Sequence, residues 1–228
     1  MKFRRKSTPA EAAPEVEAAP STPESSDPSA PSAEGTEAAE TIEVPIGPYD
    51  IDAIPVPMDQ VDRVDLGSIL VAPVPNCELR LQIDENTQEV QAVLLTSDEG
   101  ALELRAFAAP RNGDLWTEIR PQLAADITSR GGVSEEIDGP WGVHLVGQMP
   151  VVMPDGTEGV QASRIIGING PRWMLRATLI GRPAVDGEYA GTWLQGIAAS
   201  VVRRGNHALP VGEALPLVMP VQQQSPDA

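Results

Sequence analysis

Apolar and polar residues alternate along much of the chain between residues 78 and 181, which is the pattern of strands with one buried face. In ELRLQID, residues 78–84, every second residue is leucine or isoleucine. A turn-like ENTQ follows, then the run EVQAVLLT, the turn SDEG and a further alternating run, ALELRAFAA. Because connections this short join antiparallel neighbours, we expect an antiparallel sheet here.

Between residues 113 and 132 the apolar positions recur at steps of four instead of two. This spacing predicts a helix whose buried face is formed by Leu115, Ile119, Leu123 and Ile127. Asn112 or Asp114 can cap its start, and Gly131–Gly132 can end it. Pro121 lies inside the segment and removes a backbone donor, so a kink or a break is expected there.

Strand patterns resume after this helix, in GVHLVGQMPVVM, VQASRIIGI, RWMLRATLIG and the short ASVVRR. A second helix is predicted from about Gly187 to Ile197, with Trp193, Leu194 and Ile197 on its buried side. This order lacks regular strand–helix–strand alternation and therefore indicates the α+β class. We expect a mostly antiparallel twisted sheet with two helices packed on one of its faces.

The first 44 residues differ in composition from the rest, being rich in Pro, Ala, Ser, Thr and Glu and poor in large apolar residues. Such a segment buries too little surface to offset its conformational entropy. We predict a disordered tether over residues 1–44, one folded domain over 45–221 and a disordered tail over 222–228. The tether starts with a basic stub formed by Lys2, Arg4, Arg5 and Lys6.

Composition argues against several classes of protein. Cys77 is the only cysteine, so an intrachain disulfide is impossible, which fits a reducing compartment. No run of about 18 apolar residues is present, and no apolar segment of a signal peptide follows the basic start. We therefore expect a cytoplasmic protein. The sequence also lacks a phosphate-binding glycine loop and a nucleophile elbow, and we expect no cofactor.

Histidine is scarce, and His144 and His207 are the only two in the chain. Together with one cysteine they cannot form a structural zinc site, so no metal is expected. His144 lies in a predicted strand, and we expect it at the surface or edge of the sheet. His207 lies in a loop without a recognisable motif around it. Neither residue points to a catalytic constellation, and an enzymatic activity stays uncertain.

Arginine supplies every positive charge after residue 6, in a chain whose net charge is −17. Five arginines fall in or beside the predicted strands: Arg80, Arg105, Arg164, Arg172 and Arg176. Two interpretations stay open. Arg80 and Arg105 share a strand face with Glu78 and Glu103, so they can form surface ion pairs between strands. Alternatively, the arginines line a face that receives an acidic partner or an anionic ligand, since Arg172 and Arg176 are expected to share a strand face with no acid within their own strand.

Three functions follow from these observations. The leading hypothesis is a non-enzymatic protein-binding or adaptor module that contacts another protein. The second is an enzyme, or a domain that binds a small anionic ligand through the arginine-lined face. The third is weak contact of the basic stub with nucleic acid or an anionic membrane. The folded part itself is expected to be repelled by phosphate, because residues 45–228 carry 12 Arg against 24 Asp and Glu.

Several long segments resemble a family of actinobacterial proteins. These are LELRAFAAPRNGDLWTEIRPQLAADITSRGG, then GPW, then GVQASRIIGINGPRWMLRATLIGRPAV, with RVDLGSILV before them. The family is catalogued as a domain of unknown function (number three-seven-one-zero). The resemblance covers about residues 47–220 and implies an actinobacterial cytoplasmic protein, without assigning catalytic residues. The order of strands and helices is also loosely similar to the Mog1/PsbP-type sandwich, as a fold analogy alone.

Overall fold

The structure is a computed structural model of the 228-residue chain, and it describes residues 47–53, 61–153 and 156–220. All of these belong to one compact unit, Ile42–Ala228. The tether and tail expected over residues 1–44 and 222–228, with the basic stub, lie outside the described residues. The contact of the stub with nucleic acid therefore stays a prediction.

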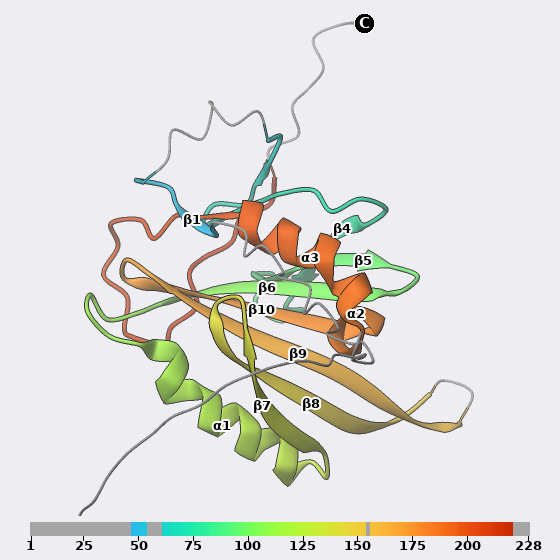
Figure 1. Ribbon diagram of the computed structural model, residues 1–228. Coiled ribbons are helices and arrows are strands. Elements are labelled where there is room, and N and C mark those ends of the chain that lie inside the picture. The colour runs from blue at the N-terminus through green and yellow to red at the C-terminus, as the bar shows by residue number, and fades with distance from the viewer. Residues whose placement is uncertain (1–46, 54–60, 154–155, 221–228) are drawn as a thin grey trace, which may run out of the picture. The chain divides into compact units, whose positions relative to one another are not determined.

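The fold is α+β, as the sequence pattern predicts, and Figure 1 shows its elements. In chain order they are β1 (Tyr49–Asp50), β2 (Val64–Asp65), β3 (Ile69–Val71), β4 (Glu78–Ile83), β5 (Val90–Ser97), β6 (Gly100–Ala108), α1 (Leu115–Ser129), β7 (Val133–Gly139), β8 (Gly142–Val152), β9 (Glu158–Gly170), β10 (Trp173–Gly181), α2 (Arg182–Val185), α3 (Gly187–Ala199) and β11 (Val201–Val202). The helix predicted from Gly187 is α3. None of the helices among the described residues is long and apolar enough to cross a bilayer.

Seven strands form one large sheet in the order β4-β5-β6-β10-β9-β8-β7. Every pairing in it is antiparallel, which confirms the expectation from the short connections. The central pairing joins β6 to β10, although α1, β7, β8 and β9 separate them in the sequence. A smaller sheet, β1-β11-β3-β2, contains the parallel pair β1 and β11. Its buried Ile69 and Val71 belong to the same core as the large sheet.

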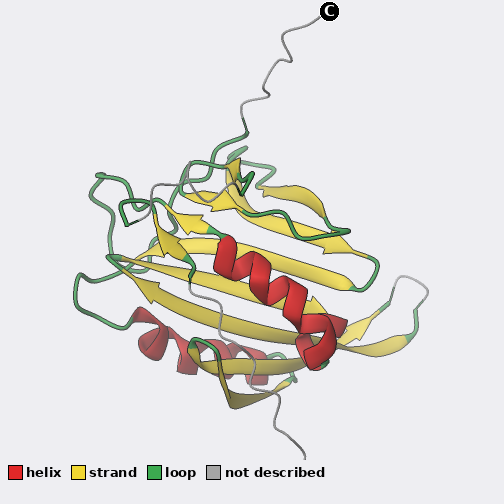
Figure 2. Ribbon diagram, turned by 45° about the horizontal axis from the view of Figure 1, so that its top comes forward, coloured by secondary structure: helices red, strands yellow, loops and turns green. Residues whose placement is uncertain are grey.

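The helices cover opposite faces of the large sheet, so the expectation that they share one face is wrong (Figure 2). The reason lies in β10. Leu175 and Ala177 pack toward α3, whereas Met174, on the other face of the strand, packs with α1. All three side chains are fully buried, and a central strand with apolar residues on both faces requires cover on both sides.

The helix count also differs from the expected two, because the four-residue α2 precedes α3. Gly181 has φ of +83°, a conformation that favours glycine, and it lets the chain turn directly from β10 into α2. Pro183 then occupies the first turn of α2, where its missing N–H costs nothing.

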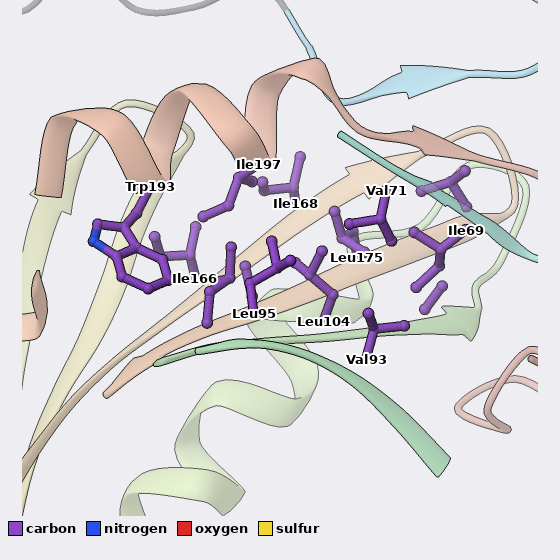
Figure 3. Packing of buried hydrophobic residues seen from close by; sticks show 14 of the residues in the cluster. Ile69, Val71, Val93, Leu95, Leu104, Ile166, Ile168, Leu175, Trp193 and Ile197 are labelled. Carbon is purple, nitrogen blue, oxygen red and sulfur yellow. The ribbon is translucent and has the colours of Figure 1, made fainter. Parts of the chain in front are cut away.

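The main core is mostly aliphatic and contains two buried tryptophans, Trp173 and Trp193, of which Figure 3 labels Trp193. It lies between α3 and the large sheet, and the labelled side chains of Figure 3 include Leu95, Leu104, Ile166, Leu175, Trp193 and Ile197. All of these are at most 3% exposed. The core therefore supports the fold without a contribution from any charged residue.

The helix α1 has well-defined ends. The Asp114 side chain caps it by accepting from the Thr117 N–H at 3.0 Å, so the cap is Asp114 and not Asn112. At the other end, Gly131 has φ of +81° and its N–H donates to Thr128 O, while the Gly132 N–H donates to Ile127 O. The helix continues through Pro121, so the alternative of a break there is wrong.

Candidate functional site

Two of the five arginines proposed from the sequence lie next to each other. Arg105 on β6 and Arg176 on β10 are direct partners in the antiparallel register, on the face of the sheet that α1 covers. Both guanidinium groups lie over the ring of Phe107, at 5.6 and 5.2 Å from its centre. We call Arg105 and Arg176 the arginine pair, and the ring of Phe107 contacts both of them.

A single carboxylate partly compensates this pair. Arg176 Nη2 lies 3.3 Å from Glu103 Oε1, and both side chains are about one-fifth exposed (19% and 22%). Burial lowers the pKa of Arg176, the Glu103 charge opposes that effect, and Arg105 adds to it. Arginine nevertheless keeps its proton. Among the described residues, the buried Nε atoms of Arg105 and Arg176 find no hydrogen-bond acceptor.

A cavity of about 260 Å³ adjoins the arginine pair on the side of α1. Its lining is formed by Phe107, Leu115, Ile119, Gln122, Leu123, Asp126, Arg176 and Gly212. Asp126 is engaged by Arg130, one helical turn further on, at 3.0 Å. The cavity thus combines apolar walls with one cationic group that is about one-fifth exposed.

The structure does not bring the other three arginines to this pair. Arg80 on the edge strand β4 is two-thirds exposed and pairs with Glu78 at 2.8 Å. Arg164 lies on the opposite face of the sheet, and its Nε donates to Ala184 O at 3.0 Å. Arg172 precedes β10 in a turn, with φ of +61°. The expectation that Arg172 and Arg176 share a strand face is therefore wrong.

His144 is buried, contrary to the expectation of a place at the surface or edge of the sheet. It lies on β8, and Gly139 on β7 leaves room for its ring, because a Cβ at Gly139 would overlap the imidazole. Burial, followed by the charge of Arg164, lowers the pKa of His144 to about 4. Neither ring nitrogen has a hydrogen-bond partner within the described part of the chain. His144 is therefore a neutral core residue.

The remaining reactive side chains are dispersed. His207 is exposed in a loop, where its carbonyl accepts from Arg204 Nη1 at 3.0 Å. Burial raises the pKa of the Cys77 thiol, and a hydrogen bond with Ser97 offsets part of this increase. Cys77 adjoins a hollow that also carries Asp98, Glu99 and Glu188. Over residues 47–53, 61–153 and 156–220, no group of three or more His, Cys, Asp or Glu is arranged to hold a metal ion.

A second candidate surface is apolar and lies at the free end of the β8–β9 hairpin. The register of β10 with β9 begins at Ser163, so residues 158–162 of β9 and their partners on β8 extend beyond β10 as a two-stranded arm. A groove of about 530 Å³ lies along this arm. We call it the hairpin groove, and its apolar lining is Val151, Val152, Met153, Val160, Ala162, Ile180 and Val185.

The groove is notable for its exposed apolar side chains. Val152 is 73% exposed, Val160 65% and Val185 57%. Arg164 anchors α2 to β9 through Ala184 O, and this contact places Val185 beside the arm. Two acidic residues lie next to lining residues of the groove: Glu158 is the register partner of Val152, and Asp186, which pairs with Arg182 at 3.9 Å, follows Val185 directly.

Sequence reasoning did not identify this groove. The available signal was the segment MPVVM, residues 149–153, in which neighbouring residues are all apolar and the strand lacks a polar side. Such a run is equally typical of a strand buried on both faces. The register distinguishes a strand buried on both faces from an exposed one, because β10 pairs with β9 only as far as Ser163 and leaves residues 158–162 without that neighbour.

Comparison with known proteins gives one informative match. The sequence profile of a family described as "Protein of unknown function (DUF3710)" matches residues 47–226. No curated protein matches the sequence. A crystal structure of a protein from Bacteroides thetaiotaomicron VPI-5482 is similar with a TM-score of 0.35 and 13% identity, over 64% of this chain and 52% of that chain. The chain thus spans about half the length of that protein, and so low a TM-score does not establish a shared fold.

The family match extends across all the elements of the fold, from β1 to β11, and includes both the arginine pair and the hairpin groove. Because the profile spans well over half of the sequence, the chain belongs to the DUF3710 family of proteins of unknown function.

Proposed function

We propose that the domain acts by binding another protein, without catalysis, and that the hairpin groove is its contact surface. The observation that supports this most strongly is the exposure of Val152, Val160 and Val185 around one groove. Apolar surface gains about 25 cal/mol for each Å² that is removed from water. A contiguous apolar surface at the tip of an arm is typical of an interaction site.

The charge of the chain favours one class of partner. Two copies of a chain with net charge −17 repel each other, so a second copy is a poor occupant of the groove. Glu158, at the border of the groove, favours a positively charged counterpart, whereas Asp186 is already paired with Arg182 at 3.9 Å. We therefore assign the groove to an apolar segment flanked by Lys or Arg on a protein of net positive charge.

A photo-cross-linking experiment tests this proposal. The photoreactive amino acid benzoylphenylalanine replaces Val160 in the full-length chain, and light is applied in native lysate. Val211, which is 55% exposed in a loop, is the matched control position. The adjacent Gly212 bonds to Ala108 at one end of β6, whereas the groove lies near Gly100 at the other end.

The expected result is an adduct at position 160, absent at position 211, whose cross-linked peptide is apolar with basic flanks. An adduct to a second copy of the same chain would contradict the proposal. So would equal labelling at the two positions, or a cross-linked peptide that is acidic.

A cytoplasmic location forms part of the proposal. It is supported by the cysteine content, because a chain with one cysteine gains nothing from an oxidising compartment. Fractionation of cells that express the full chain tests it, and recovery in the extracellular fraction would contradict it.

A further inference from the structure

The arginine pair carries an excess of positive charge that the described residues do not balance. Arg105 and Arg176 face each other across β6 and β10, and Glu103 is the one carboxylate within ion-pair distance of either in the described part of the chain. Two like charges in direct register on a sheet destabilise each other. The local balance is therefore one net positive charge, in a chain whose total is −17.

One donor atom of each arginine in the pair lacks a hydrogen-bond acceptor among the described residues. The Nε atoms of both arginines are buried and unpartnered among the described residues. A buried donor without an acceptor costs about 1–3 kcal/mol, and more when the group is charged. The ring of Phe107 stabilises the two cations through its face but supplies no acceptor for their N–H groups.

The adjoining cavity sets the remaining properties of a ligand. Leu115, Ile119 and Leu123 of α1 form an apolar wall opposite Arg176. Asp126, the one acidic residue in the lining, is neutralised by Arg130. The volume of about 260 Å³ is below the range of roughly 300–1,000 Å³ that is usual for drug-sized ligands.

We propose that this cavity binds a small organic monocarboxylate with an apolar body. The carboxylate pairs with the guanidinium of Arg176, the member of the arginine pair that lines the cavity, and its single charge matches the local excess. The apolar body occupies the space between Phe107 and the leucines and isoleucine of α1. A dianionic phosphate is a poorer match, because Glu103 leaves only one uncompensated positive charge.

The site is independent of the protein contact proposed above. Arg176 faces α1, whereas the hairpin groove includes Val185 of α2, a helix that directly follows the C-terminal end of β10. A failure of either proposal therefore leaves the other intact.

Binding of hexanoate to the full-length chain tests the inference, with hexan-1-ol and hexylamine as neutral and cationic analogues. Phe3 and Phe107 are the only phenylalanines, so selective labelling of phenylalanine rings gives an NMR signal that reports on the cavity. We expect hexanoate to shift the Phe107 signals, hexan-1-ol to bind at least tenfold more weakly, and hexylamine to leave these signals unchanged. Equal binding of hexanoate and hexan-1-ol would overturn the proposal.

Variants then test the residues. Arg176→Gln should weaken hexanoate binding at least tenfold, whereas Arg80→Gln, at an exposed arginine on β4, should change it less than twofold. If Arg176→Gln does not fold, Leu123→Trp fills the cavity and keeps both arginines. This variant should abolish the Phe107 shift while it retains the circular dichroism spectrum of the native chain. Unchanged hexanoate affinity in a folded Arg176→Gln or Leu123→Trp variant would refute the site.

Discussion

Single residues decide how this core responds to acid, and His144 is the clearest case. Its side chain is 1% exposed, and burial lowers its pKa from 6.5 to about 4. Between these two pH values His144 is protonated in the unfolded chain and neutral in the folded chain. The free energy of unfolding therefore falls as the pH drops from about 6.5 toward 4, and this contribution is absent above pH 6.5.

The expected effect can be measured by urea unfolding at pH 7 and pH 4.5. The wild type should lose about 2–3 kcal/mol more between these pH values than the His144→Leu variant does. His207→Leu, at an exposed histidine, should behave like the wild type. An identical loss in the wild type and in His144→Leu would show that the imidazole is not held neutral.

A glycine fixes the position of α1. Gly167 on β9 lies directly beneath the Trp116 ring, and a Cβ there would overlap the indole. The Trp116 Nε1 donates to Val143 O at 2.7 Å, so the ring cannot move away without losing this bond. Gly167→Ala should therefore lower the free energy of unfolding by about 1–3 kcal/mol.

The same substitution elsewhere should have the opposite sign. Gly191 lies within α3, and a Cβ there meets nothing within 4 Å. Gly191→Ala should raise the free energy of unfolding by up to about 1 kcal/mol through helix propensity. Thermal unfolding of Gly167→Ala and Gly191→Ala measures both changes in stability. Equal destabilisation of the two variants would contradict the predicted clash with Trp116.

At the scale of elements, α1 is attached to the sheet through its first residues. Asp114 Oδ1 accepts from the Thr117 N–H that needs a cap and from Asn169 Nδ2 on β9, at 3.0 and 2.6 Å. Asp114→Ala leaves both donors without this acceptor and should cost about 1–2 kcal/mol. Asn112→Ala removes the alternative cap and should change stability by less than about 0.5 kcal/mol. Chemical denaturation measures the free energy of unfolding of both variants. A similar loss in Asp114→Ala and Asn112→Ala would contradict the assignment of Asp114 as the cap.

The elements themselves were largely predictable from periodicity. The four-residue spacing from Leu115 to Ile127 predicted α1, and Gly131–Gly132 marked its end. The faces that the helices cover were not predictable in the same way. Met174 and Leu175 are adjacent apolar residues, and only the pairing of β10 with both β6 and β9 shows that each face needs its own helix.

The candidate sites depended even more on pairing between distant segments. Arg105 and Arg176 are 71 residues apart, and their opposition follows from the β6–β10 register, which no local pattern encodes. The sequence therefore supplied the residue type, and the register selected two of five arginines. His144 was misplaced because alternation along β8 does not reveal that Gly139 leaves room for a ring.

At the scale of the whole domain, the two proposed sites lie at different places on the large sheet. The α1 face holds a cationic pair beside a small cavity, and the end of the sheet near α2 presents an apolar groove. Most of the remaining surface charge is negative, because residues 45–228 carry twice as many acidic residues as arginines. In the proposed complex, the acidic surface would attract a basic protein at long range, and the valines of the hairpin groove would be buried once the two proteins are in contact.

The central claim is that the hairpin groove, and not the general acidic surface, holds the partner. The most direct test is the dissociation constant of the protein recovered by cross-linking, measured for the wild type, Val160→Asp and Val211→Asp at low and high salt. Both substitutions add one negative charge at an exposed valine, so they differ only in position. We predict at least tenfold weaker binding for Val160→Asp, less than twofold change for Val211→Asp, and weaker binding of the wild type at high salt. Equal losses in the two variants, or an affinity that does not depend on salt, would contradict the account.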